Sequence, residues 1–234
     1  MATTIHDPVR RALAAALLLF PCLFVLVFLM HFRHPGDFFH FRLHYEPLPP
    51  ERVVKSLIRA GNRRPLVHDP HVIGYLSLPF IPLCSFALYV VGRSARPLAS
   101  AVTMVVTVTG TIYLGGVFGM WTAFYRGLGL VDPTYTEGAI ATFKAMTANQ
   151  GAFLLTTSLA KLAMIGLGAQ ALTLAGRIPG WAIACIVLGA GLFLAFWDLD
   201  NWMTLGMLLF FAGFLPIRRE LLRAPVADSE SSGG

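Results

Sequence analysis

Charged residues are scarce in this sequence. They make up 13% of its 234 residues, whereas hydrophobic residues make up 56% and the mean hydropathy is +0.68. A soluble domain carries about 25% charged residues, so the composition excludes a soluble protein and predicts a membrane domain. The net charge is +6, but no run of five or more basic residues occurs. The positive charge falls in loops and at helix ends, so nucleic acid is not an expected partner.

Cysteine is also scarce, and the common catalytic motifs are missing. Cys22, Cys84 and Cys185 each lie inside an apolar segment, and the sequence has no CxxC pair. A disulfide framework and a sulfur-ligated metal are therefore not indicated. The sequence also lacks a phosphate-binding glycine loop, GxSxG and HExxH, and it has no internal repeat. These absences remove several hydrolase, nucleotide-binding and inverted-repeat transporter classes from consideration.

Long apolar segments dominate what is present. A helix needs about 20 apolar residues to cross the hydrocarbon of a bilayer. Six segments approach this length: 12–30, 72–92, 98–124, 151–176, 180–197 and 201–216. The first follows Arg10 and Arg11 but is longer than a usual signal core and has no small-x-small cleavage site after it, so we expect a retained transmembrane helix. The last two are short and predict a tight hairpin.

The predicted fold is all-α: a polytopic integral membrane protein of about six transmembrane helices, in one domain over 1–223. A long extracytoplasmic loop, 31–71, contains an amphipathic helix that Pro50 opens and Gly61 closes, and this helix would lie along the lipid headgroups or against the bundle. A second short helix is predicted from Thr136 to Asn149. The tail 224–234 is small, polar and acidic and is expected to be disordered.

Orientation follows from the distribution of Lys and Arg. With six crossings both termini share a side, and that side holds eight arginines in its tails and short loops, against two basic residues on the other side when the long first loop is left out. Counting that loop makes the comparison eight against nine. Because short loops are the more informative, we expect cytoplasmic termini in a bacterial inner membrane.

Small residues are frequent in the third to fifth predicted helices. Gly115 and Gly119 form a small-xxx-small pair, and Gly166, Gly168, Gly189 and Gly191 continue the pattern. Such residues let helices approach closely in lipid. We expect them to serve packing within the bundle, with contact between molecules as the alternative.

Histidine gives the clearest chemical signal. Six of the seven histidines lie between His31 and His71. His31 and His34 close the first predicted helix, and His68 and His71 open the second, so neighbouring helices would gather four imidazoles. Zinc, copper and iron accept such ligands, and Asp69 could ligate or orient a ring. The alternatives are histidines that contact lipid or stabilise structure, and a pH-sensing or proton-relay role.

Charged residues near the membrane form two further sets. Lys161 lies well inside the fourth predicted helix, where an ionisable group calls for a partner, and Asp198 and Asp200 are the candidates. The first loop also carries a set predicted to contact lipid headgroups: Arg52, Lys55, Arg59, Arg63 and Arg64.

Three functions follow as hypotheses. The first is an accessory or structural subunit of a larger membrane complex, whose partners are membrane lipids and other membrane protein subunits and which holds lipid or pigment at its outer face. The second is a small membrane enzyme or metal-handling protein that uses the histidine cluster. The third is a proton- or ion-coupled carrier that uses Lys161 and Asp198.

Overall fold

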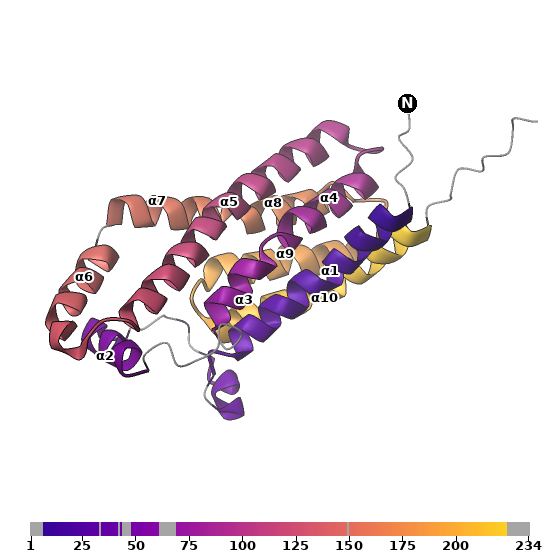
Figure 1. Cartoon of the computed structure of the whole chain (residues 1–234). Coiled ribbons are helices and arrows are strands. Elements are labelled where there is room, and N and C mark those ends of the chain that lie inside the picture. The colour runs from indigo at the N-terminus through magenta and orange to yellow at the C-terminus, as the bar shows by residue number, and fades with distance from the viewer. Residues whose placement is uncertain are drawn as a thin grey trace, which may run out of the picture.

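The computed structural model describes residues 7–32, 34–41, 43, 48–60, 69–148 and 150–223. Within these ranges the protein is a bundle of helices with no strand beyond a single bridge between Ala175 and Ile178 (Figure 1). The elements are α1 (Asp7–Leu29), η1 (Pro35–Phe39), α2 (Pro50–Ala60), α3 (Pro70–Ser77), α4 (Phe80–Gly92), α5 (Pro97–Leu128), η3 (Pro133–Tyr135), α6 (Thr136–Ala148), α7 (Gln150–Ala160), α8 (Leu162–Leu172), α9 (Gly180–Ala195) and α10 (Asp200–Arg223).

Four helical stretches are long and apolar enough to cross a membrane: Pro8–Leu29, Pro70–Gly92, Pro97–Leu128 and Leu154–Leu172. They coincide with the first four predicted spans, and the all-helical membrane prediction is confirmed at this level. The predicted fifth span corresponds to α9, whose 16 residues reach only about 24 Å. The sixth corresponds to α10, which is longer than predicted and packs along α1 and α9.

Local sequence explains where several helices begin and break. The Asp69 carboxylate accepts the backbone N–H of His71, and Pro70 occupies the first turn of α3, where its missing N–H costs nothing. The candidate membrane span Pro70–Gly92, which begins with α3, is interrupted at Leu78 and Pro79 and continues as α4. A proline inside a helix removes a backbone hydrogen bond and clashes with the preceding turn, so Pro79 accounts for this break.

The core of the bundle is aromatic and aliphatic. Phe20 and Phe24 of α1 and Phe210 and Phe214 of α10 are fully buried, and the rings of Phe20 and Phe210 lie 5.8 Å apart in an edge-to-face arrangement. Aromatic pairs of this geometry add about 0.5–1.5 kcal/mol beyond the area they bury. The first and last helices are therefore held together along their length.

The crossing of α5 and α8 depends on two glycines. A Cβ atom on Gly110 of α5 would lie 1.9 Å from the backbone nitrogen of Ala163 in α8, and one on Gly166 would lie 2.3 Å from the Thr107 hydroxyl. The pair predicted from the sequence, Gly115 and Gly119, makes looser contacts within the bundle. Close packing inside the molecule therefore explains Gly166, and Gly110, which the sequence analysis did not single out, makes the closer approach in the same crossing.

A polar cluster that the sequence analysis did not identify joins α4, α5 and α8. Gln170 is fully buried, accepts the Ser85 hydroxyl at 2.7 Å and donates to the Ser85 carbonyl at 2.9 Å. The Ser100 and Thr173 hydroxyls lie 3.0 Å apart beside it. Since these groups satisfy one another, they can remain inside an apolar bundle without a large desolvation penalty.

A second, smaller hydrophobic cluster lies beside the main core, in what we call the α2–α6 lobe: α2, the last turns of α5, η3 and α6. Its core contains Val54, Leu128, Ala139, Ile140 and Phe143. The amphipathic helix therefore buries its apolar face in this lobe, the second of the two predicted placements. Lys144 of α6 forms an ion pair with Glu51 of α2, which holds the pKa of that carboxyl below its ordinary value. Figure 1 shows α2 and α6 together at one end of the molecule.

Candidate functional site

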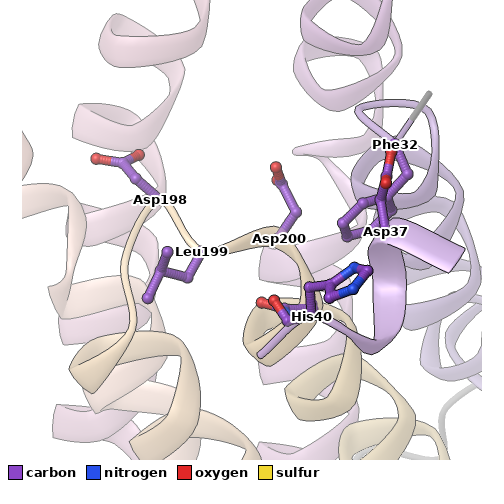
Figure 2. A pocket seen from close by; sticks show the side chains of 7 residues that line it. Phe32, Asp37, His40, Asp198, Leu199 and Asp200 are labelled. Carbon is purple, nitrogen blue, oxygen red and sulfur yellow. The ribbon is translucent and has the colours of Figure 1, made fainter. Parts of the chain in front are cut away.

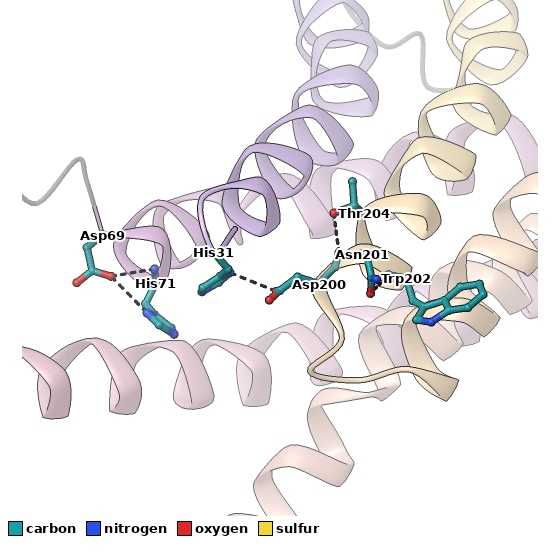
Figure 3. Close-up of polar contacts among 7 residues, drawn as sticks. All are labelled: His31, Asp69, His71, Asp200, Asn201, Trp202 and Thr204. Carbon is teal, nitrogen blue, oxygen red and sulfur yellow. Dashed lines mark hydrogen bonds and ion pairs between the residues drawn. The ribbon is translucent and has the colours of Figure 1, made fainter. Parts of the chain in front are cut away.

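The end of α1 and the start of α3 meet at the end of the bundle opposite the start of α1, which we call the histidine end. His31 follows α1 and its Nδ1 lies 3.2 Å from Oδ1 of Asp200, the first residue of α10. Both side chains are partly exposed, and Figure 3 shows this contact between the two helices. The pair therefore joins the end of the first helix to the beginning of the last.

A second group lies on α3 and α5. His71 Nδ1 is 3.3 Å from Asp69 Oδ1, and Arg126 Nε is 3.4 Å from the other oxygen of the same carboxylate. Burial alone would raise the pKa of Asp69, but the hydrogen bonds and charge of His71, together with the charge of Arg126, outweigh it and lower the pKa. Asp69 is thus held as a carboxylate between two positive or hydrogen-bonding neighbours.

The two groups meet at the imidazoles. The ring centroids of His31 and His71 lie 5.5 Å apart with an interplanar angle of 72°, and the His71 ring also meets Tyr125 edge-on at 5.1 Å. Arg126, Asp69, His71, His31 and Asp200 thus form a continuous line of side chains, here called the polar row. It links α5, α3, α1 and α10, and Figure 3 shows its members Asp69, His71, His31 and Asp200.

The other predicted metal ligands are placed differently. His34 is exposed, and its backbone N–H donates to the Asp37 carboxylate at 3.1 Å. His68 lies outside the described residues. In the part of the chain that the structure describes, no group of three or more His, Cys, Asp or Glu side chains is arranged to hold a metal ion. The structure therefore brings two of the four predicted imidazoles together, and the metal site remains a prediction.

A cleft of about 260 Å³ opens beside the polar row (Figure 2). Its lining comes from the segment after α1, the α9–α10 connection and the first two residues of α10: Phe32, Asp37, His40, Asp198, Leu199, Asp200 and Asn201. Asn201 is almost fully buried, and its amide donates to the backbone carbonyl of His40 at 3.1 Å. This hydrogen bond fixes η1 against the start of α10 and so shapes the cleft.

Asp198 lies in the short connection between α9 and α10. Its φ of 71° lies in the left-handed region, which is unusual for a residue other than glycine. Partial shielding of its carboxyl group from water raises its pKa, and the neighbouring carboxylate of Asp200 raises it further. The charges of Lys161 and His31 act in the opposite direction without reversing the shift.

Lys161 lies at the junction of α7 and α8, inside the fourth span. Its Nζ is 5.8 Å from the ring centroid of Trp197, two residues beyond the end of α9. The ammonium therefore has an aromatic partner, a contact worth about 0.5–2 kcal/mol. Of its two predicted partners, Asp198 is close enough for the charges to interact, whereas Asp200 is paired with His31.

Three of the five residues predicted to contact lipid headgroups can be placed in the structure. Arg52, Lys55 and Arg59 are exposed on α2, on the side away from Val54. Arg63 and Arg64 lie outside the described residues. The exposed positive face predicted for this helix is therefore present for the three residues that can be placed.

Sequence reasoning missed Arg126 and Asn201 as members of this end of the bundle. Arg126 is one of the two basic residues counted above on the other side of the membrane, although an arginine in the last turns of a long apolar helix is itself a signal for a nearby carboxylate. Nothing in the sequence around Asn201 indicates its partner. The partner is the backbone carbonyl of His40, which reaches Asn201 only because η1 folds against the start of α10.

Comparison with known proteins adds no assignment: no protein-family model, no curated protein and no solved structure matches this chain. The chemistry of the histidine end therefore has to be judged from its own geometry. The polar row can tie four helices together, and its two adjacent imidazoles could share a proton or contribute to a metal site.

Proposed function

We propose that this protein is an accessory subunit of a larger membrane assembly, with six membrane crossings and cytoplasmic termini in a bacterial inner membrane. An even number of crossings is supported by Figure 1, in which α1 begins and α10 ends at the same end of the bundle. The excess of arginine in the tails and short loops at that end supports its cytoplasmic placement.

The observation that carries the proposal is apolar surface outside the four candidate spans. Five large hydrophobic side chains in the connections at the histidine end are more than half exposed: Phe39 74%, Leu43 64%, Leu48 53%, Leu130 76% and Tyr135 70%. Inside a span such exposure would be covered by lipid, but beyond the span it favours contact with a protein. The exposed arginines and lysine of α2 would contact anionic headgroups next to that interface.

The polar row supports the same function. The contacts of His31 and His71 with carboxylates join or position helices, and no group of three or more potential metal ligands is gathered among the described residues. These side-chain contacts stabilise one conformation of the histidine end. A preorganised surface binds a partner at a lower entropic cost.

Site-specific photocross-linking in cells tests the proposal. A benzophenone side chain placed at Tyr135 or Phe39 is expected to give protein adducts of discrete mass. The matched control is Tyr113, which is 37% exposed within the α5 span and is expected to label only lipid. Absence of protein adducts at Tyr135 and Phe39, together with a monomer in mild detergent, would contradict the proposal.

Metal handling is the second hypothesis, and the proximity of His31 and His71 favours it. Rings 5.5 Å apart need only a modest rearrangement and a third ligand to share a zinc, copper or iron ion. Elemental analysis of the purified protein distinguishes the two hypotheses. Near-stoichiometric metal that is lost in the His31→Ala/His71→Ala variant and retained in His40→Ala would support metal handling.

A further inference from the structure

The end of the bundle opposite the histidine end, here called the arginine end, is strongly basic. Figure 1 shows that α1 begins there and that α10 ends there. Among the described residues this end carries eight arginines against two acidic residues, Asp7 and Glu220. An excess of one charge attracts ligands of the opposite charge, and phospholipid phosphates line both surfaces of a membrane.

Arg218 of α10 differs from its exposed neighbours at this end. Its side chain is partly buried, whereas Arg11, Arg219 and Arg223 are exposed. Its Nε is shielded from water and has no hydrogen-bond partner among the described residues. A shielded donor on a charged group carries a free-energy penalty unless an acceptor reaches it, so Arg218 calls for an anionic ligand.

The sequence explains why Arg218 is partly buried. It lies four residues after Phe214 and three before Leu221, both of which are buried in the face that α10 packs into the bundle. Arg10 of α1, which is also partly buried, precedes the buried Leu13 in the same way. Residues three or four apart share a helix face, so each arginine continues the packed face of its helix.

The packing of the first helix on the last gives the depth of Arg218. The Phe20 ring meets Phe210 at 5.8 Å and Phe214 at 6.4 Å, so Phe20 is level with the turn between them. At 1.5 Å per residue, Arg218 then lies about 9 Å from Phe20 toward the arginine end, and Arg10 lies about 15 Å from it in the same direction.

This depth places the Arg218 backbone below the lipid headgroups. Phe20 is near the middle of the candidate span Pro8–Leu29, and half of a hydrocarbon layer is about 15 Å thick. A long side chain that starts inside this layer extends its guanidinium to the polar boundary, where the lipid phosphates lie.

Two features favour a phospholipid over a small soluble anion. Apolar side chains are exposed next to the arginines of this end: Val9 44%, Leu98 77% and Leu222 43%. A ligand that has both a phosphate and hydrocarbon chains covers these side chains and also meets the charge. Arginine is suited to the phosphate, because its guanidinium can donate two parallel hydrogen bonds to phosphate oxygens, and Nε is one of those donors.

We propose that the arginine end binds the phosphate of one anionic phospholipid between the start of α1 and the end of α10. Arg218 donates to the phosphate, and Arg10, nearer the membrane surface, adds positive charge beside the headgroup. This site does not depend on the proposed subunit function or on which side of the membrane the arginine end occupies, because both leaflets contain phospholipid.

Native mass spectrometry of the full-length protein in detergent tests the proposal. The two probes are phosphatidylglycerol, which is anionic, and phosphatidylcholine with the same acyl chains. The wild type is expected to retain phosphatidylglycerol selectively, and Arg218→Gln is expected to lower that retention several-fold. Arg223→Gln is the matched control, since it removes the same charge from an exposed position on the same helix and should retain the lipid. Arg218→Lys keeps the charge without the paired donors and should fall between the wild type and Arg218→Gln.

Thermal unfolding of the wild type gives a second measurement that does not depend on how any variant folds. Phosphatidylglycerol is expected to raise the melting temperature more than phosphatidylcholine does, because a ligand that binds the folded state stabilises it. An excess of inorganic phosphate alone should not reproduce this rise.

Three results would overturn the proposal. Equal stabilisation and retention of the two lipids would show that the charge of the headgroup is not recognised. An equal loss of retention in Arg218→Gln and Arg223→Gln would show only a general attraction to the net charge of this end. A rise in melting temperature with inorganic phosphate that matches the rise with phosphatidylglycerol would indicate a site for a soluble anion.

Discussion

His31 Nδ1 and Asp200 Oδ1 lie 3.2 Å apart, although one residue follows the first helix and the other begins the last. This pair and the buried phenylalanines of α1 and α10 hold the first and last helices of the chain against each other. The contact brings the predicted histidine cluster and the predicted acidic hairpin into one site.

The energetic contribution of this pair is expected to be small. Both side chains are about a third exposed, at 32% and 27%, so solvent screens their attraction. In a double-mutant cycle with His31→Gln and Asp200→Asn, the coupling free energy of unfolding is expected to be about 0.2–1 kcal/mol. Thermal or denaturant unfolding in detergent at pH 6 measures it. A coupling well above this range would show a contact that is more shielded than the structure indicates.

Asp69 predicts a dependence of stability on pH. Its pKa is lowered in the folded protein from the ordinary value of 3.8, so its contribution to stability is present at neutral pH and is lost as the pH falls through the lowered pKa. Asp69→Asn is therefore expected to be less stable than the wild type at pH 7, with the difference shrinking below pH 3.8. Melting temperatures measured from pH 7 to pH 3 test this, with the exposed Glu137→Gln as control. A difference that stays constant across this range would refute the assigned role.

Gly110 predicts a strong steric effect. Because a Cβ there would collide with the backbone of Ala163, Gly110→Val is expected to force α5 and α8 apart and destabilise the fold by about 1–3 kcal/mol or more. Gly127 lies later on the same helix, and a Cβ there meets nothing within 4 Å. Gly127→Ala is thus the control and is expected to leave the melting temperature unchanged. Equal behaviour of the two variants would show that the α5–α8 crossing is looser than described.

Gln170 predicts the cost of an unsatisfied polar group inside the bundle. Gln170→Leu keeps a similar volume but removes the acceptor of the Ser85 hydroxyl, and is expected to lower the free energy of unfolding by about 1–3 kcal/mol. The double variant Gln170→Leu/Ser85→Ala removes both partners and should recover part of that loss. Failure of Ser85→Ala to recover any stability would mean that packing, rather than hydrogen bonding, explains the effect.

The helices were predictable because their signals are local. The apolar run 12–30 corresponds to Pro8–Leu29 and the run 72–92 to Pro70–Gly92, since about 20 apolar residues suffice to specify a span. The short helix that begins at Pro50 and the helix predicted from Thr136 are also present, as α2 and α6. Proline at the start of α2 and the turn sequence before Thr136 mark these helices without reference to the rest of the chain.

The contacts between helices were not predictable in the same way. The residues alone specify an apolar helical chain with histidines near two helix ends and a lysine inside a span. The contacts of His31 with Asp200, of Asp69 with Arg126 and of Lys161 with Trp197 arise from the folded arrangement of the helices. Apolar length and helix caps act within one turn or one span, whereas ion pairs and grooves depend on which helix faces lie together, and that choice is made by the packing of the whole bundle.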